Sequence, residues 1–520
     1  MGREKPELGA KERPFDIFVI GGGVNGCGVA RDAAGRGYKV GLAEMNDLAS
    51  GTSSKSTKLI HGGLRYLESR QFRLVREALA EREVLLRMAP HLVRPLRFVL
   101  PVQKGMRPAW LLRLGLFLYD HLGGRETLPA TTTLDLTRAG AGKPLKPHFA
   151  KGFEYSDCRV DDARLVVLNA RDAADRGAVI LPRTQVVSAR GADAVWRVAL
   201  RDGTTGAETE IFTRLLVNAA GPWVEEIVAE VCAQNSPRRL RLVRGSHIVV
   251  ARIFDHDGAY IFQNPDGRVV FAIAYEGDYT LIGTTDVDFS GAPDKVAITP
   301  EEIDYLCRAA SAHFVRRVET ADVVWAFSGL RALVGDSASA AHRATRETVV
   351  EERRIGGAPL INVYGGKITG YRRLAEKILQ RIGAAIGPRG ESWTARTPLP
   401  GGDFPGGDLA RFVRTLRAQK PFLAPSLAWR LARAYGTLCL GFLEPARRMA
   451  DLGEDFGGGL TRAEVDYLVE REWARTPEDI LWRRSKLGLR ALESETGKLA
   501  AYFAARQRKS DARTSRENPQ

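Results

Sequence analysis

Three glycines between an apolar run and an alanine-rich stretch constrain the fold of this chain more than any other feature. Residues 16–20 (DIFVI) are predicted to form a strand, and Gly21, Gly23 and Gly26 follow with the spacing GxGxxG. A helix is predicted over residues 24–36, and a second strand over 39–44 ends on Glu44. A strand, a glycine turn, a helix, a strand and a terminal acid together predict the first unit of a parallel, dinucleotide-binding sheet.

Each residue of this motif has its own physical reason. Gly21 permits a tight turn, Gly23 lets a pyrophosphate approach the backbone, and Gly26 lets the helix pack closely. The N-terminus of the helix stabilises phosphate charge, and Glu44 is placed to accept a hydrogen bond from a ribose hydroxyl. The alternative is a glycine turn that serves packing alone.

NAD and FAD share this motif, so the choice of cofactor depends on later segments. Residues 48–58 (LASGTSSKSTK) form a hydroxyl-rich loop that is suited to wrapping the longer FAD molecule, although a solvated loop is the alternative. Residues 365–370 (GGKITG) precede a helix predicted over 369–386, whose positive N-terminus would face the pyrimidine edge of a flavin. These segments favour FAD, with predicted cofactor contacts at Gly21, Gly23, Gly26, Glu44, Thr52, Ser53, Ser54, Lys58, Gly221, Gly366, Lys367 and Thr369.

The pattern of strands, helices and turn residues predicts an α/β fold with three domains. A Rossmann-like FAD-binding domain (14–90, 150–240 and 330–390) is interleaved with an antiparallel-sheet substrate-binding domain (91–149 and 241–329). A cluster of Pro and Gly between 398 and 407 precedes a C-terminal all-α domain (400–507) and a flexible tail (508–520). Residues 90–150 are rich in Pro, Gly and Thr and are expected to be irregular.

The charge balance indicates an anionic partner. The chain has 77 Lys and Arg against 62 Asp and Glu, a net charge of +15. Nucleic acid, an anionic membrane surface and a phosphorylated small molecule all fit that sign. No nucleic-acid partner is expected, because the sequence has no RNA-binding module and no regular alternation of aromatic and basic residues.

Other features suggest a cytoplasmic protein without a metal site. The N-terminal residues are charged and include no apolar signal segment, and the longest apolar stretch, 109–122, is too short to span a bilayer. That stretch is nevertheless suited to lying on a membrane, as are the basic helices predicted around 411–433. The five cysteines are scattered, which argues against a disulfide framework, a zinc site or a redox pair, and most are expected to be buried.

Several motifs resemble those of one family, the FAD-dependent sn-glycerol-3-phosphate dehydrogenases, most of all the bacterial aerobic, quinone-linked type. They cover nearly the whole chain and lie at 16–44, 53–67 (SSKSTKLIHGGLRYL), 152–163 (GFEYSDCRVDDA), 217–223 (VNAAGPW), 244–250 (RGSHIVV), 281–287 (LIGTTDV), 365–374 and 478–489 (EDILWRRSKLGL). The resemblance implies that glycerol 3-phosphate is oxidised to dihydroxyacetone phosphate, with hydride passing from C2 to FAD and electrons passing to membrane quinone. It also implies a C-terminal cap domain, peripheral attachment to the cytoplasmic membrane, and a homodimer.

The resemblance also implies a set of site residues. Arg65, Arg331, Arg346 and Lys367 correspond to substrate-pocket cations, which suits a phosphomonoester because it is nearly a dianion. Tyr66 is expected to line the same pocket, and Thr285 and Asp286 are expected to shape the sheet.

Removal of the C2 hydroxyl proton requires a base, and two histidines lie inside matched motifs. His247 is the preferred base or hydroxyl orienter, and His61 is expected beside the flavin; with Arg331 they form the predicted catalytic group. One departure is Gly370, where the family usually has a hydroxyl residue, so a hydrogen bond near the flavin or the substrate is expected to be missing.

Three alternative functions are compatible with parts of the sequence. A glycerol-3-phosphate oxidase, which passes electrons to oxygen, shares almost every motif. A basic flavoprotein that binds or modifies RNA is suggested by charge alone. A flavin-bound protein without turnover is the third.

Overall fold

The computed structural model describes residues 9–103, 107–235, 239–334 and 348–517, with side chains described as far as residue 508. The chain divides into two compact units. The first comprises residues 1–88 and 93–397, and the second comprises 89–92 and 398–520. Each unit is described separately.

The first sheet of the first unit is built on five parallel strands. They follow the order β18 (Ala358–Tyr364), β10 (Glu208–Asn218), β1 (Phe15–Ile20), β2 (Val40–Glu44) and β7 (Val179–Pro182). Antiparallel β17 (Val349–Ile355) lies at one edge, and β8 (Thr184–Ala192) and β9 (Val195–Asp202) extend β10. Helix α1 (Val24–Gly35) packs against α4 (Asp162–Asp175) and α7 (Tyr371–Ile386). All six residues of β1 are buried, as expected for a central strand that is covered on both faces.

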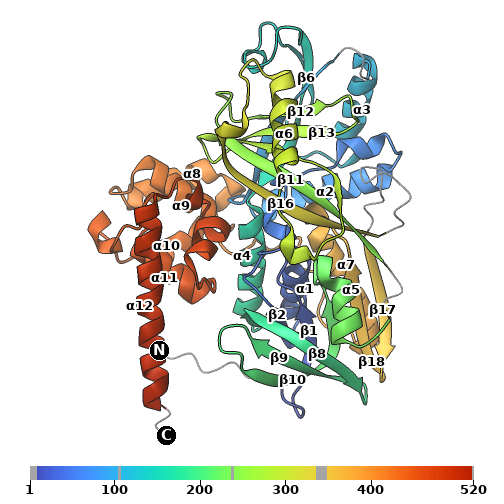
Figure 1. Ribbon diagram of the computed structural model, residues 1–520, viewed down its shortest axis with the longest axis vertical. Coiled ribbons are helices and arrows are strands. Elements are labelled where there is room, and N and C mark those ends of the chain that lie inside the picture. Colours follow the sequence, from blue (N-terminus) through green and yellow to red (C-terminus); the bar gives the residue numbers. More distant parts are fainter. Residues whose placement is uncertain (1–8, 104–106, 236–238, 335–347, 518–520) are drawn as a thin grey trace. The chain divides into compact units, whose positions relative to one another are not determined.

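The second sheet has ten strands and is mostly antiparallel (Figure 1). Its main order is β15 (Val287–Phe289), β11 (Leu240–Ala251), β14 (Tyr279–Gly283), β13 (Val269–Tyr275), β12 (Ala259–Gln263), β4 (Val93–Pro101), β6 (Lys151–Val160) and β3 (Leu59–Ile60). Strand β16 (Val323–Val334) pairs with β11, and β5 (Thr132–Asp135) pairs with β6. Helices α2 (Phe72–Met88), α3 (Ala109–Leu122) and α6 (Pro300–His313) belong to the same unit.

The two faces of this second sheet differ in chemistry. On one face, Ile248 and Ile282 pack with Leu306 and Ala310 of α6 in an apolar cluster. Because side chains alternate along a strand, the neighbours of these residues point to the opposite face. That opposite face carries His247 and several glycines, and it forms one wall of the candidate site.

The second unit is helical. It contains α8 (Leu409–Gln419), α9 (Pro425–Tyr435), α10 (Cys439–Leu443), α11 (Arg462–Arg471) and α12 (Glu493–Glu517). Leu416, Leu431, Leu468 and Ile480 lie in one buried core. A buried core of its own is what an independently packed helical domain requires.

The fold class predicted from the sequence is confirmed, whereas the expectation for residues 90–150 is wrong. Residues 90–150 contain β4, α3 and β5 instead of irregular structure, because β4 is held by β6 and β12, which are distant in sequence and invisible to local turn signals. Helix α12 continues to Glu517, so most of the segment expected to be a flexible tail is helical. Its Ala, Arg, Lys and Glu residues are good helix formers, and their polarity does not oppose a helix. The residue boundaries of the three predicted domains stay predictions.

Candidate active site

A cavity of about 1300 Å³ in the first unit is lined by residues from both sheets. One end is the glycine turn between β1 and α1, and the other is the glycine-bearing face of β11 and β16. The turn between β18 and α7, the loop after β2, helix α2, strand β8 and residues 221–231 also contribute to the wall. A cavity of this volume suits a dinucleotide together with a small second molecule.

The glycine turn has the geometry that its sequence predicts. Gly21 has φ +109°, and a Cβ there would lie 2.6 Å from the carbonyl oxygen of Ala219. A Cβ on Gly26 would lie 1.9 Å from the oxygen of Gly21, so Gly26 serves the packing of α1 and does not line the cavity. Gly23 is the N-cap of α1 and has no side chain to occupy the helix N-terminus. No side chain of the turn itself therefore separates the backbone from an approaching phosphate, although the Val24 amide is paired with the Ser53 hydroxyl.

Glu44 lies at the end of β2 on the cavity wall. Its Oε2 accepts a hydrogen bond from the Gly22 amide at 2.7 Å, and its Oε1 accepts one from the Asn46 amide at 2.9 Å. Burial raises the pKa of this carboxyl above its usual value. Each oxygen of a carboxylate retains a second lone pair, so the group can still accept from a ribose hydroxyl.

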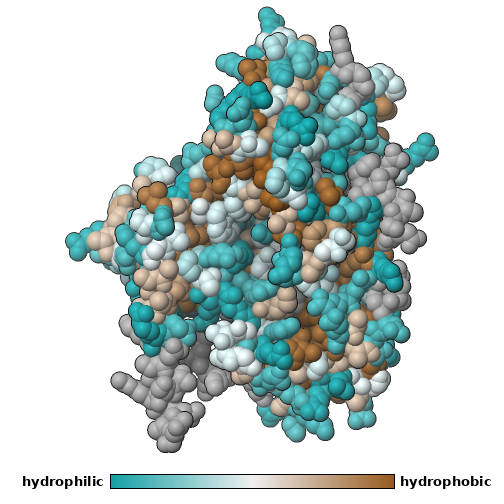
Figure 2. Space-filling view, in the orientation of Figure 1, coloured by the Kyte–Doolittle hydropathy of each residue, from teal (hydrophilic) through white to brown (hydrophobic). Residues whose placement is uncertain are grey.

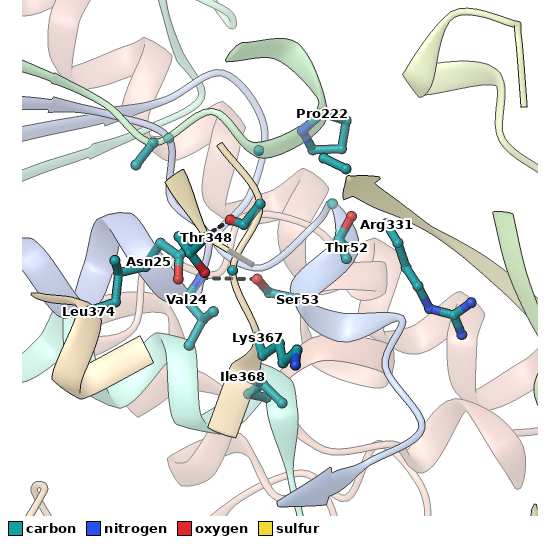
Figure 3. Close-up of a pocket in the computed structure, with 18 of the residues that line it drawn as sticks. Val24, Asn25, Thr52, Ser53, Pro222, Arg331, Thr348, Lys367, Ile368 and Leu374 are labelled. Carbon is teal, nitrogen blue, oxygen red and sulfur yellow. Dashed lines mark hydrogen bonds between the residues drawn. The ribbon is translucent and has the colours of Figure 1, made fainter. Parts of the chain in front are cut away.

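The hydroxyl-rich loop connects several elements. Thr52 donates to the carbonyl oxygen of Leu330 at 2.8 Å, and Ser53 accepts from the amide of Val24 at 3.0 Å (Figure 3). Lys58 is 4% exposed, and its ammonium lies 2.7 Å from Oδ2 of Asp162. Thr52 and Ser53 line the cavity, whereas Ser54 and Lys58 do not appear in its described wall. Within the described residues, Lys58 thus anchors the loop to α4.

His247 lies at the sheet end of the cavity and is 1% exposed. Its ring stacks on Phe327, with centroids 4.9 Å apart, and covers Gly283, where a Cβ would lie 2.1 Å from the ring. Nε2 is 3.0 Å from Oγ1 of Thr57, and Nδ1 has no hydrogen-bond partner within the described part of the chain. Burial, together with the positive charges of Arg331 and Lys58, lowers the pKa of His247 well below its usual value. The imidazole is therefore neutral near pH 7.

Arg331 projects from β16 at the cavity wall (Figure 3). The turn after β14 holds its guanidinium. Its guanidinium donates to Oγ1 of Thr284 at 3.0 Å and to the carbonyl oxygen of Thr285 at 3.3 Å, and it forms an ion pair with Asp286. Gly245 on β11 leaves room for the Arg331 guanidinium, because a Cβ there would lie 2.6 Å from it. Asp286, expected to shape the sheet, thus also pairs with a predicted substrate cation.

The turn before α7 forms a third wall. Gly365 and Gly366 both have positive φ, +78° and +116°, which glycine adopts without strain. Nζ of Lys367 lies 4.1 Å from the centre of the Tyr66 ring. Oγ1 of Thr369 accepts from the amide of His61 at 3.3 Å, so it joins this turn to the end of β3.

Most of the predicted site residues meet around one cavity. Those on its wall are Gly21, Gly23, Glu44, Thr52, Ser53, His61, Tyr66, Gly221, His247, Arg331, Gly366, Lys367 and Thr369. Arg65 is not part of the described wall, and Arg346 lies outside the described residues.

Sequence reasoning missed Asn25 and Thr57 on the same wall. Asn25 donates to the oxygen of Gly365 at 3.1 Å, and its buried Oδ1 has no partner among the described residues. Thr57 belongs to the hydroxyl-rich loop, so its residue type could have marked it as a site residue. Its contact with His247 could not be predicted, because the two residues are distant in sequence.

Comparison with known proteins agrees with this geometry. Residues 16–372 match the family described as FAD dependent oxidoreductase, and residues 392–513 match the C-terminal domain of alpha-glycerophosphate oxidase. The aerobic glycerol-3-phosphate dehydrogenase of Escherichia coli is 48% identical over 475 residues, which is 91% of this chain and 94% of that protein. The chain belongs to the FAD-dependent glycerol-3-phosphate dehydrogenase family.

Two further relatives refine this placement. D-erythritol 1-phosphate dehydrogenase of Brucella abortus is 51% identical over 494 residues, covering 95% of this chain and 98% of that protein. The crystal structure of the glycerol-3-phosphate dehydrogenase from Bacillus halodurans complexed with FAD has a TM-score of 0.74 and 30% identity, and it covers 92% of this chain and 87% of that one. FAD is thus the cofactor of the family member described here. The glycine turn, Glu44 and the buried Oδ1 of Asn25, which has no partner among the described residues, fit a dinucleotide of this kind.

Proposed function

We propose that this FAD-dependent dehydrogenase oxidises glycerol 3-phosphate at C2 to dihydroxyacetone phosphate. The observation that carries the proposal is that the buried, neutral His247 and the Arg331 guanidinium lie on the same face of one sheet and on the wall of one cavity. A hydroxyl acceptor next to a fixed cation is what the oxidation of a phosphorylated alcohol requires.

The roles of the residues follow from their chemistry. Arg331 and Lys367 bind the phosphate, and Tyr66, which lies under the Lys367 ammonium, orients that cation. Arg65 and Arg346 are retained as proposed substrate cations on the strength of the motifs alone. His247 accepts or orients the proton of the C2 hydroxyl, while His61 lies on the wall next to Thr369. Bound FAD supplies the acceptor for the hydride that leaves C2.

A second candidate substrate is a four-carbon polyol phosphate such as D-erythritol 1-phosphate. The Brucella abortus relative supports it, and so does Gly370 on the cavity wall. Gly370 has φ −101°, so its backbone does not require glycine, and a Cβ there would meet nothing within 4 Å. A hydroxyl side chain at this position would project into open space, and its absence leaves room for a larger ligand.

The proposed reaction is tested by anaerobic titration of the purified, FAD-loaded protein. Glycerol 3-phosphate is expected to bleach the visible absorbance of the flavin, and glycerol is not. Preferential bleaching by D-erythritol 1-phosphate would reassign the substrate. If neither phosphate bleaches the flavin, the proposed reaction is wrong, and a flavin-bound protein without turnover becomes the better hypothesis.

We further propose that the electrons pass to membrane quinone from a homodimer attached peripherally to the cytoplasmic membrane. No helix among the described residues is long and apolar enough to cross a membrane. Support for peripheral contact comes from α3, where Trp110, Leu111, Leu114 and Phe117 are 68%, 40%, 47% and 49% exposed. The competing oxidase activity predicts peroxide release in air at a rate comparable to quinone-linked turnover.

A further inference from the structure

A buried polar cluster lies on the α6 side of the second sheet, behind the candidate catalytic residues. Its centre is Glu302 in the first turn of α6, which is 6% exposed. Oε1 of Glu302 accepts from the hydroxyl of Ser246 at 2.9 Å and from the hydroxyl of Thr285 at 2.7 Å. The hydroxyls of Ser246 and Ser328 are 2.7 Å apart, and the amide of Ser246 donates to Oγ1 of Thr285 at 2.9 Å. None of these four residues is part of the described cavity wall.

Two hydroxyl residues of this cluster, Ser246 and Thr285, are next in sequence to groups on the cavity side. Ser246 precedes His247 in β11, so their side chains point to opposite faces of the sheet. Thr285 is the middle residue of the turn whose three residues all contact Arg331. Oε1 of Glu302 thus accepts hydrogen bonds both from the strand that carries His247 and from the turn that holds Arg331.

The other oxygen of Glu302 has a different task. Oε2 accepts from the amide of Thr299 at 3.2 Å, and the hydroxyl of Thr299 accepts from the amide of Glu302, which forms a capping box at the start of α6. Oε2 also lies 2.9 Å from Nε of Arg244. The cap and the cluster therefore use separate atoms of one side chain, and they can be disturbed one at a time.

We propose that Glu302, acting through Thr285 and Ser246, is a positioning residue that sets where Arg331 and His247 face the substrate. The inference rests on the proposed oxidation of a polyol phosphate and deepens it. A buried acceptor that fastens two hydroxyls restricts the backbone beneath them, and a displacement of about 1 Å in a binding group is enough to weaken a charged ligand substantially. Loss of the Oε1 contacts frees the turn at residues 284–286, and the Arg331 guanidinium moves with it.

The test compares Thr285→Val with Thr285→Ser and Thr299→Val in FAD-loaded protein. Thr285→Val removes the hydroxyl that faces Oε1 and keeps the side-chain shape, whereas Thr285→Ser restores the hydroxyl. Thr299→Val removes the helix cap alone and is the matched control for lost stability. The quantities measured are kcat, KM for glycerol 3-phosphate or D-erythritol 1-phosphate, the affinity for inorganic phosphate, FAD content and the denaturation midpoint.

Thr285→Val is expected to raise KM and the dissociation constant of inorganic phosphate about tenfold with FAD still bound. Thr285→Ser is expected to stay within about twofold of the parent protein, and Thr299→Val to lower the denaturation midpoint without changing KM. Equal effects of Thr285→Val and Thr299→Val on KM, or no effect of Thr285→Val, would overturn the proposal.

Two further measurements keep the outcome decisive. If Thr285→Val does not fold, Ser246→Ala removes the other hydroxyl from Oε1, and a KM equal to that of the parent protein would then contradict the proposal. If the parent protein oxidises neither polyol phosphate, the proposed function fails on its own, while binding of inorganic phosphate still reports whether Thr285 positions Arg331.

Discussion

At the scale of single residues, the site depends on glycines that make room for larger side chains. Gly283 lies under the ring of His247, and Gly245 lies beside the guanidinium of Arg331. A Cβ at either position would come within 3 Å of its neighbour, so the two functional side chains could not keep their places. The sequence predicted His247 and Arg331 as site residues, but the role of these glycines depends on pairing between strands that are distant in sequence.

Replacement of His247 by alanine is expected to slow flavin reduction about 100-fold, because it removes the group that receives or orients the hydroxyl proton. FAD content is expected to stay unchanged. The rate is measured by anaerobic stopped-flow absorbance, with His256→Ala as the control, since His256 lies in the loop between β11 and β12 and outside the described cavity wall. An unchanged rate in His247→Ala would remove His247 from this role.

The same variant tests the ionisation of His247. In the folded protein the pKa of this group is lowered, so the unfolded chain takes up its proton first as pH falls below about 6.5. The free energy of unfolding that depends on His247 is therefore present above about pH 6.5 and is lost at lower pH. Denaturation curves of His247→Ala are expected to show a weaker decline in stability below pH 6.5 than those of the parent protein.

Arg331→Ala is expected to raise KM for the phosphorylated substrate about 10- to 100-fold, because charge-assisted hydrogen bonds to the phosphate are lost. Inorganic phosphate should lose affinity in parallel. Arg241→Ala is the matched control, since Arg241 pairs with Asp288 on the same sheet but is not part of the described cavity wall. Equal effects of both variants would show that general positive charge, and not Arg331, binds the phosphate.

At the scale of elements, local patterns predicted the strand, turn and helix around the glycine motif almost to the residue. The expected strands at 16–20 and 39–44 and the helix at 24–36 correspond to β1, β2 and α1. The hydroxyl-rich loop was predicted as a region but not in its contacts. Lys58 is bound to Asp162 and Thr57 to His247, and neither partner is close in sequence. Residue type indicated hydrogen bonding, but only the tertiary fold selects the partner.

Lys58→Met tests whether Lys58 anchors the loop to α4 or contacts the cofactor. It leaves the carboxylate of Asp162 buried without its ammonium, which is expected to lower the free energy of unfolding by about 3 kcal/mol. Urea denaturation of the FAD-loaded protein measures the loss, and Lys295→Met, which removes an exposed pair with Asp294, is expected to cause almost none. Loss of FAD at unchanged stability would instead support the direct cofactor contact predicted from the sequence.

At the scale of the whole molecule, the net charge of +15 exceeds what one phosphorylated substrate needs. On the face shown in Figure 2, apolar side chains lie in separate patches among hydrophilic ones. Exposed apolar residues of α3 recur at 110, 111, 114 and 117, which places them along one side of the helix, and Arg113 beside them is also exposed. This combination of apolar side chains and a nearby cation suits insertion at an anionic interface.

Trp110→Ser with Phe117→Ser is therefore expected to weaken binding to anionic vesicles by at least tenfold, because each buried aromatic side chain contributes about 1.5–3 kcal/mol. Cosedimentation with vesicles at low salt measures the effect, and Val324→Ser, at a residue that is 53% exposed and outside α3, is the control. Binding to uncharged vesicles should be weaker, because cations near an anionic surface contribute about 1 kcal/mol each. If the double variant still binds vesicles but its dimer dissociates in light scattering, α3 is an interface between two copies of the chain. If neither vesicle binding nor dimerisation changes, α3 has no docking role.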